Sequence, residues 1–155
     1  MSANQKNNIM TETRIFDSEN KPSLQQKNQI VDFLYANLEQ YGDSKSAIEK
    51  AIDYSLGENS SKGGFTMLLD DNQILKGVVV INHTGMGGYI PENILVYIAT
   101  HKGYRGEGLG KKLMEKVISE TKGDIALHVE ANNPAKKLYE KFGFTNPYLE
   151  MRLKK

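Results

Sequence analysis

Residues 104–112 read Tyr-Arg-Gly-Glu-Gly-Leu-Gly-Lys-Lys, and the rest of the chain is interpreted outward from them. They follow an apolar run, Ile94 to Thr100, and open an amphipathic one, Leu109 to Ile118. A glycine-rich turn between a strand and a helix directs several backbone N–H groups at one point, with the positive end of the helix dipole behind it. Glycine also lets the backbone approach a phosphate without an intervening Cβ. The stretch therefore predicts an anion-binding loop.

The loop has the spacing Arg-x-x-Gly-x-Gly, which differs from the two most familiar phosphate-binding patterns. It is not the dinucleotide fingerprint, and Gly110-Lys111 is not followed by the Ser or Thr of a Walker loop. The basic residues around it outnumber the single acidic one, Glu107, which favours an anionic ligand. They are Lys102, Arg105, Lys111 and Lys112. Alone, the loop leaves two other readings open: a tight basic turn without a ligand, and a nucleotide-phosphate site for ATP or NAD.

Length and composition limit the choices. A chain of 155 residues suits one domain, which we expect over residues 11–155, after a polar and mobile lead-in at 1–10. Its 20 Lys and Arg against 19 Asp and Glu give no reason to expect a nucleic-acid partner. The absence of cysteine excludes disulfides, thiolate metal sites and a cysteine nucleophile. Without a signal-peptide core or a membrane-length apolar run, we expect a soluble cytoplasmic protein without a membrane partner.

Apolar periodicity predicts the elements of the first half. Two helices are expected, each opened by a Ser followed three residues later by Gln or Glu: Ser23 with Gln26, and Ser46 with Glu49. The expected strands are Thr11–Phe16, Phe65–Leu69 and Ile74–Ile81, the last two joined by a turn at Asp70–Asn72. Gly77, inside a strand, predicts a bulge or a close backbone approach.

The second half predicts a strand–helix–strand unit followed by a last helix and strand. The expected strands are Asn93–Thr100, Ile125–Glu130 and Tyr148–Leu153, and Asn133 is expected to cap the last helix. Since two strands joined through a helix pair in parallel, the first two of these should be parallel neighbours.

A second motif downstream supports the loop. It consists of Asn132, Ala135, Leu138, Tyr139 and the pair Gly143-Phe144. With both motifs in this order, residues 65–153 resemble the GNAT superfamily of N-acetyltransferases. The resemblance implies an α/β (α+β) fold: a mixed, mostly antiparallel sheet flanked by helices, whose central parallel strands splay apart to admit acetyl-CoA.

The resemblance also implies the residues that hold acetyl-CoA. The pantetheine arm would pair with the backbone of the strand before the loop, and the pyrophosphate would lie against the N–H groups of the loop and helix. Asn132 would bond the pantetheine or orient a nearby water. The implied cofactor-binding residues are Ile98, Ala99, Thr100, Arg105, Gly106, Glu107, Gly108, Leu109, Gly110, Lys111, Asn132 and Tyr139. No metal is implied.

By the same resemblance, Tyr139 is the general acid that protonates the departing thiolate. Because the chain has no cysteine, the acetyl group would pass directly to a primary amine in a ternary complex. The general base is open, because the family often places a glutamate where this chain has Ile94 or Val96. Glu92 is the first candidate, acting through water, and Glu130 and His83 are the others. A GNAT module that binds acetyl-CoA without turnover is the alternative function.

The chain after Gly143-Phe144 is short for this family. One side of the acceptor groove would then be open, which suits a protein or peptide amine, or filled by a second subunit of a homodimer. The sequence leaves both arrangements open, and with them the choice between a small amine and a protein amine.

Overall fold

The computed structural model describes residues 11–155, and the lead-in expected at 1–10 lies outside the described residues. Five strands form one sheet, in the order β1-β2-β3-β4-β5. The strands are β1 (Thr11–Phe16), β2 (Gly64–Asp71), β3 (Ile74–His83), β4 (Asn93–Thr100) and β5 (Ile125–Leu127). The helices are α2 (Leu24–Leu38), α3 (Lys45–Ser55), α4 (Leu109–Glu120) and α5 (Lys136–Lys141), with short 3₁₀ turns η1 (Glu39–Tyr41), η2 (Glu58–Ser60) and η3 (Lys102–Tyr104).

The sheet is mixed, as the sequence predicts. β1 to β4 pair antiparallel in chain order, whereas β4 and β5, joined through α4, are parallel. The parallel pairing is short, since its register runs only from Asn93 opposite Ile125 to Leu95 opposite Leu127. Beyond Leu95 the two strands part, so the expected splay of the central parallel strands is confirmed.

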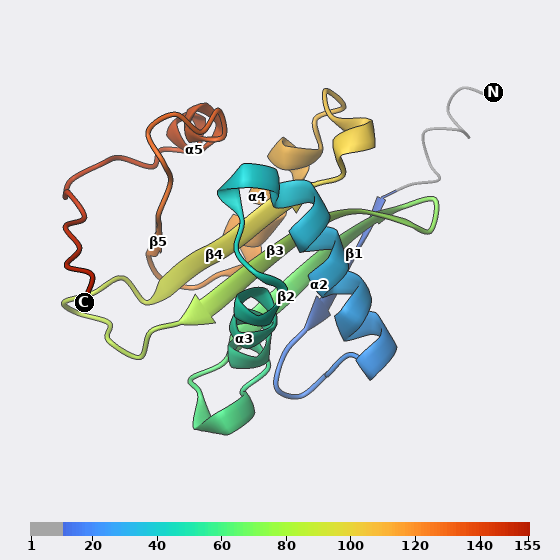
Figure 1. Ribbon diagram of the computed structural model, residues 1–155, viewed down its shortest axis with the longest axis horizontal. Helices are drawn as coiled ribbons and strands as arrows, with labels where there is room; N and C mark the ends of the chain where they lie inside the picture. Colours follow the sequence, from blue (N-terminus) through green and yellow to red (C-terminus); the bar gives the residue numbers. More distant parts are fainter. Residues whose placement is uncertain (1–10) are drawn as a thin grey trace.

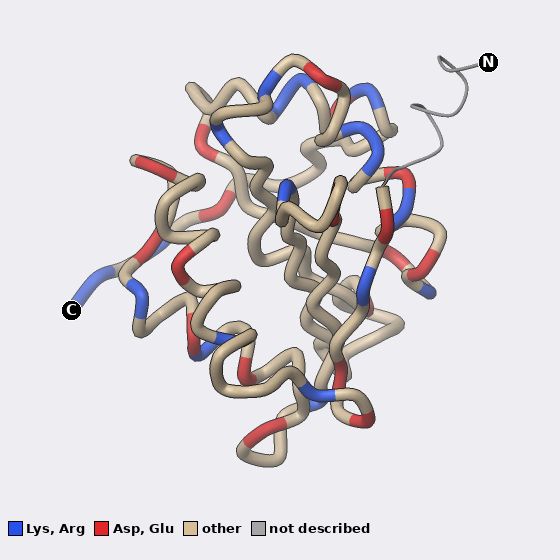
Figure 2. The backbone as a smooth tube through the Cα atoms, turned by 90° about the vertical axis from the view of Figure 1, so that its right-hand side faces the viewer, with Lys and Arg blue, Asp and Glu red and all other residues tan. Residues whose placement is uncertain are grey.

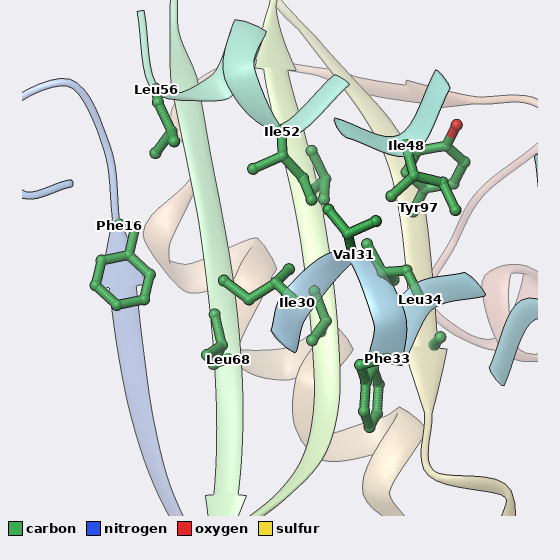
Figure 3. Packing of buried hydrophobic residues seen from close by; sticks show 13 residues of the cluster. Phe16, Ile30, Val31, Phe33, Leu34, Ile48, Ile52, Leu56, Leu68 and Tyr97 are labelled. Carbon is green, nitrogen blue, oxygen red and sulfur yellow. The ribbon is translucent and has the colours of Figure 1, made fainter. Parts of the chain in front are cut away.

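Helices cover both faces of the sheet. In Figure 1, α2 and α3 lie in front of the strands and α4 lies behind them. The front core, shown in Figure 3, joins α2 and α3 to the sheet through side chains such as Ile30, Leu34 and Ile48. The core behind contains Leu113, Met114 and Val117 of α4. A strand buried on both faces reads as a continuous apolar run, which explains Val78 to Ile81 in β3.

One of the two predicted helix caps is confirmed, and the other is wrong by two residues. Ser23 accepts a hydrogen bond from the N–H of Gln26, whose side chain bonds back to Ser23. The cap of α3 is Ser44, which accepts from the N–H of Ala47 at 3.2 Å, and Ser46 lies inside the first turn. A cap needs extended backbone, and Ser44 has it (φ −62°, ψ 156°).

Of the two alternatives predicted for Gly77, the bulge occurs next to it, and the element that approaches it closely does so through a side chain and not through backbone. β3 carries an extra residue, Lys76, opposite the junction of Leu69 and Asp70 in β2, which is a bulge. A Cβ on Gly77 would also lie 2.6 Å from Cδ1 of Leu113. The glycine thus lets α4 pack closely on β3 and fixes the position of the helix that follows the glycine loop.

The C-terminal predictions need correction. β5 ends at Leu127 and not at Glu130, and α5 begins at Lys136, although Asn133 Oδ1 accepts the N–H of Ala135 at 2.9 Å just before it. The strand expected at Tyr148–Leu153 is absent, and its large apolar side chains lie in solvent. A strand needs a partner, and within this chain β5 offers an edge of only three residues. None of the helices in residues 11–155 is long and apolar enough to cross a membrane.

Candidate functional site

The site is centred on the opening between β4 and β5. Residues 97–100 of β4 pair with β3 on one side but have no β5 partner on the other. Val96 is an extra residue in the β3–β4 ladder, where the register shifts beside Val80 and Ile81, and this bulge lies where the strands part. Backbone groups that face the opening need hydrogen-bond partners. Ile98, Ala99 and Thr100, the predicted pantetheine contacts, belong to this open stretch.

The glycine loop closes one end of the opening. Gly106 (φ 88°) and Gly108 (φ 76°) are left-handed, and a Cβ at either position would meet nothing within 4 Å. Gly108 is the N-cap of α4 and provides no side-chain acceptor for the first turn. The N–H groups at the start of α4, through Lys111, therefore have no acceptor within the helix. Open space over free N–H groups at a helix N-terminus fits a phosphate.

The end of α2 holds this loop in place. Asn37 is buried, and its Oδ1 accepts the N–H of Lys102 at 2.8 Å. Arg105 donates to Glu39 Oε1 at 2.8 Å and to the carbonyl of Asn37 at 3.0 Å. In this structure, Arg105 is thus turned toward α2 and fixes the loop, whereas its predicted contact is the cofactor. Asn37 was missed in the sequence, although a polar residue beside the apolar stripe of α2 is a signal for it.

Lys76, at the bulge of β3, contacts the glycine loop at Tyr104. Its Nζ lies 3.8 Å from the centre of the Tyr104 ring and donates to Asp71 Oδ2 at 2.8 Å. The bond to Asp71 is the main cause that raises the pKa of Lys76. This contact between Lys76 and Tyr104 was not predicted, because a lysine within a strand pattern does not indicate a distant partner.

Tyr139 lies in the buried cluster that also contains Leu109 of α4, with Ile98 of β4 packed against it. α5 contacts the first turn of α4, because a Cβ on Gly110 would lie 3.2 Å from Leu138 Cδ2. Burial raises the pKa of the Tyr139 phenol to about 12, so the hydroxyl is protonated at neutral pH. The structure therefore brings the Tyr139 side chain together with the start of α4 and the open part of β4.

Residues 61–146 match the family model of the acetyltransferase (GNAT) domain, which is more than half of the chain. The chain belongs to the GNAT acetyltransferase family. It is accordingly an acyltransferase domain with the fold that its two motifs predict.

Solved structures agree with this fold. A possible acetyltransferase from Clostridium difficile 630 is 16% identical with a TM-score of 0.67, over 94% of this chain and 97% of that one. The ribosomal-protein-alanine N-acetyltransferase from Brucella melitensis biovar Abortus 2308 is 13% identical (TM-score 0.63; 93% and 98% covered). The aminoglycoside N-acetyltransferase AAC(6')-Iy, solved in complex with CoA, is 14% identical (TM-score 0.61; 94% and 95% covered).

In this GNAT domain, the segment between α2 and α3 reaches both sides of the opening. Tyr41 donates to the carbonyl of Asn132 at 3.3 Å, beyond β5. Asp43 accepts a hydrogen bond from the hydroxyl of Tyr97, on β4, at 2.6 Å. Burial, and then the bond to Asp43, raise the pKa of Tyr97 well above its ordinary value. Asn132, a predicted cofactor contact, is exposed and is held here through its backbone.

Glu92, the first candidate base, lies at the start of β4, at the opposite end of the strand from the glycine loop. Its Oε1 accepts the N–H of Asp124 at 2.8 Å, and this bond is the main cause that lowers the pKa of the Glu92 carboxyl. Glu92 thereby holds the turn that leads into β5. The structure does not bring Glu92 and Tyr139 into one hydrogen-bonded group, and the role of Glu92 as a base stays a prediction.

The other two candidates are His83, at the end of β3, and Glu130. His83 Nδ1 is 2.8 Å from Asn93 Oδ1, and Glu130 is exposed after the end of β5. Within residues 11–155, no group of His, Asp or Glu side chains is arranged to hold a metal ion.

We expect Gly108→Val to weaken CoA binding tenfold or more, which corresponds to ~1.4 kcal/mol. The valine would strain a left-handed position and fill the space above the free N–H groups. Titration calorimetry measures the change, with circular dichroism to check folding. Arg105→Lys should have a smaller effect, because the loop backbone is intact in that variant.

Gly88→Val is the matched control for this experiment. Gly88 is also left-handed (φ 101°) with free space at its Cβ, but it lies in the β3–β4 connection. The control should bind CoA as the wild type does. Unchanged affinity in a folded Gly108→Val protein would contradict the assignment of the loop.

Proposed function

We propose that this GNAT domain transfers the acetyl group of acetyl-CoA directly to a primary amine. The observation that carries the proposal is a continuous path in the fold. It runs from the free N–H groups at the start of α4, along the unpaired edge of β4, to the buried side chain of Tyr139. A non-catalytic acetyl-CoA module would need the first two features and not the third.

The residues present fit acetyl-CoA. Gly106 and Gly108 would leave room for the pyrophosphate, and the backbone of Ile98 to Thr100 would pair with the amides of the pantetheine arm. When bound, acetyl-CoA supplies the activated acetyl thioester. The chain's own contribution is then to hold that group where the strands part and to assist departure of the sulfur.

Tyr139 is proposed to donate its hydroxyl hydrogen to the departing sulfur. With a pKa near 12 the phenol is a weaker acid than an ordinary thiol, whose pKa is about 8.5. Its main contribution is therefore a hydrogen bond that stabilises the developing thiolate, ahead of full proton transfer. Such a bond strengthens as charge develops and so lowers the barrier more than it favours substrate binding.

The attacking amine must be neutral, and Glu92 is the proposed base, acting through water. Its carboxylate is ionised at neutral pH, as a base must be, although the hydrogen bond that lowers its pKa also makes it a weaker base. The role of Glu92 as a base can be tested apart from its structural role. Glu92→Gln keeps an oxygen that can accept the N–H of Asp124 but removes the carboxylate.

The acceptor is proposed to enter beside Tyr41 and Asp43, which border the opening. The two named neighbours are, by their names, enzymes for a protein alanine and for an aminoglycoside, so the shared chemistry is an amine of either kind. A second copy of the chain is the other proposed partner, on the strength of the exposed apolar C-terminal segment. Since acetyl-CoA is the donor, we propose the cytoplasm as the location.

We expect Tyr139→Phe to lower kcat by ~10²-fold while the KM for acetyl-CoA changes little. The substitution keeps the ring and its packing and removes only the hydroxyl. Release of free CoA across a panel of amines and peptides measures the reaction. Tyr89→Phe, at an exposed tyrosine of the β3–β4 connection, is the control and should not change kcat.

Two results would overturn this assignment. A wild-type kcat for Tyr139→Phe would mean that the thiolate leaves unassisted, and a collapse of acetyl-CoA binding would make Tyr139 structural. Acetyl-CoA binding by the wild type without CoA release for any amine would favour the non-catalytic module.

For Glu92→Gln we predict that kcat/KM falls most at acidic and neutral pH. The loss should shrink at high pH, where the acceptor amine is already neutral and no base is needed. The pH–rate profile is the measurement, with Glu130→Gln as the parallel variant. A profile that is only scaled down, or is unchanged, would assign the role to Glu130, His83 or bulk water.

A further inference from the structure

The C-terminal segment, residues 148–155, has no function in the site described above, yet it exposes an unusual amount of apolar surface. Tyr148, Leu149, Met151 and Leu153 are each 83–91% exposed. Clusters of exposed large apolar side chains mark interaction sites. Figure 1 shows this segment beyond β5, on the side away from β4, where the sheet has a free edge.

The segment alternates between apolar and polar residues. Leu149, Met151 and Leu153 occupy odd positions, and the charged residues Glu150, Arg152 and Lys154 occupy even ones. In extended backbone, alternate side chains point to opposite faces, so the segment has one apolar face and one charged face. The side chain of Arg152 contacts that of Glu150, as two residues on the same face can.

We propose that the C-terminal segments of two copies pair as antiparallel strands about a two-fold axis at Met151. This register places Glu150 opposite the partner's Arg152, and Arg152 opposite the partner's Glu150. On the other face, Leu149 lies opposite the partner's Leu153. Tyr148 lies opposite the partner's Lys154, a pair that favours contact between a cation and a ring. Each side chain then has a complementary neighbour.

The charged residues also disfavour the other ways in which the segment could pair. A parallel arrangement of two copies would place Glu150 against the partner's Glu150 and Arg152 against the partner's Arg152, which repels. The chain's own nearest edge, β5, reads Ile-Ala-Leu and offers no charge to either residue. The second copy therefore fits the segment better than the first copy's own sheet does.

The predicted dimer is a weak one. A ribbon of about seven residues per strand buries much less than a standard interface of about 1,600 Å², so association should depend on protein concentration. It rests on the C-terminal segment alone and is independent of acetyl transfer. Its failure would remove the second copy as a partner and leave the proposed acetyl transfer standing, and failure of the acetyl transfer would leave the dimer standing.

Met151→Cys is the direct test, since the chain has no cysteine of its own. Residues directly opposite in an antiparallel pair have Cα atoms about 4.5–5.5 Å apart, within reach of a disulfide. Leu149→Cys is the matched control, because the two copies of that residue would lie four positions, ~13 Å, apart. Mild oxidation of the full chain should link Met151→Cys into a covalent dimer and leave Leu149→Cys unlinked on a non-reducing gel. Equal linking, or none, would overturn the register.

Charge reversal tests the pairing without a cross-link. Glu150→Arg should weaken association at least tenfold in sedimentation equilibrium, because arginines would then face each other. The double variant E150R/R152E should restore it, since opposite charges again meet. A wild type that stays monomeric at every concentration, or a dimer indifferent to Glu150→Arg, would overturn the proposal.

Discussion

The backbone hydrogen bonds of β4 are the constraint on which the site depends. A central strand needs partners on both sides, and β5 satisfies only residues 93–95. The remaining residues of β4 keep one side open at the place where the strand leads into the glycine loop. Because α4 must cover the sheet behind and still begin at that loop, Gly77 is required to let Leu113 pack closely. The opening, the loop and the helix are thus consequences of one short parallel pairing.

The end of α2, which covers the face of the sheet opposite α4, holds the glycine loop in place. Asn37 makes two hydrogen bonds in a buried position, each with a net contribution of about 1 kcal/mol, and would leave costly unpaired groups if removed. A few residues later in the chain, Tyr41 and Asp43 border the opening itself. One segment therefore connects the proposed phosphate site to the proposed acceptor entrance, which links the geometry of the two.

Periodicity and glycine spacing in the sequence predict most strands, two of the helix stripes and the parallel crossover, because these depend on local patterns. Ser46 was taken for Ser44 because two serines stand near the start of α3, and only the backbone geometry tells them apart. The strand at Tyr148–Leu153 was wrong because an alternating pattern does not reveal whether a partner strand exists. Asn37 was missed because its place beside the apolar stripe of α2 marks a buried polar residue but does not identify the partner, Lys102, which lies 65 positions away.

Hydrogen exchange in the presence of acetyl-CoA tests the central claim most directly, since it reads the open edge of β4 residue by residue. If the pantetheine and pyrophosphate occupy the opening, saturating acetyl-CoA should slow exchange at amides within residues 96–100 that face β5, and at residues 106–111. Amides of β1 and β2, on the far side of the sheet, should exchange as before. Protection elsewhere with no change in these two segments would contradict the assignment.

A nonspecific effect of anions is excluded by repeating the measurement with inorganic phosphate. This control is needed because several Lys and Arg lie at the upper end of the molecule in Figure 2, where the glycine loop also lies. Phosphate alone should leave residues 96–100 unprotected, whereas acetyl-CoA should protect them.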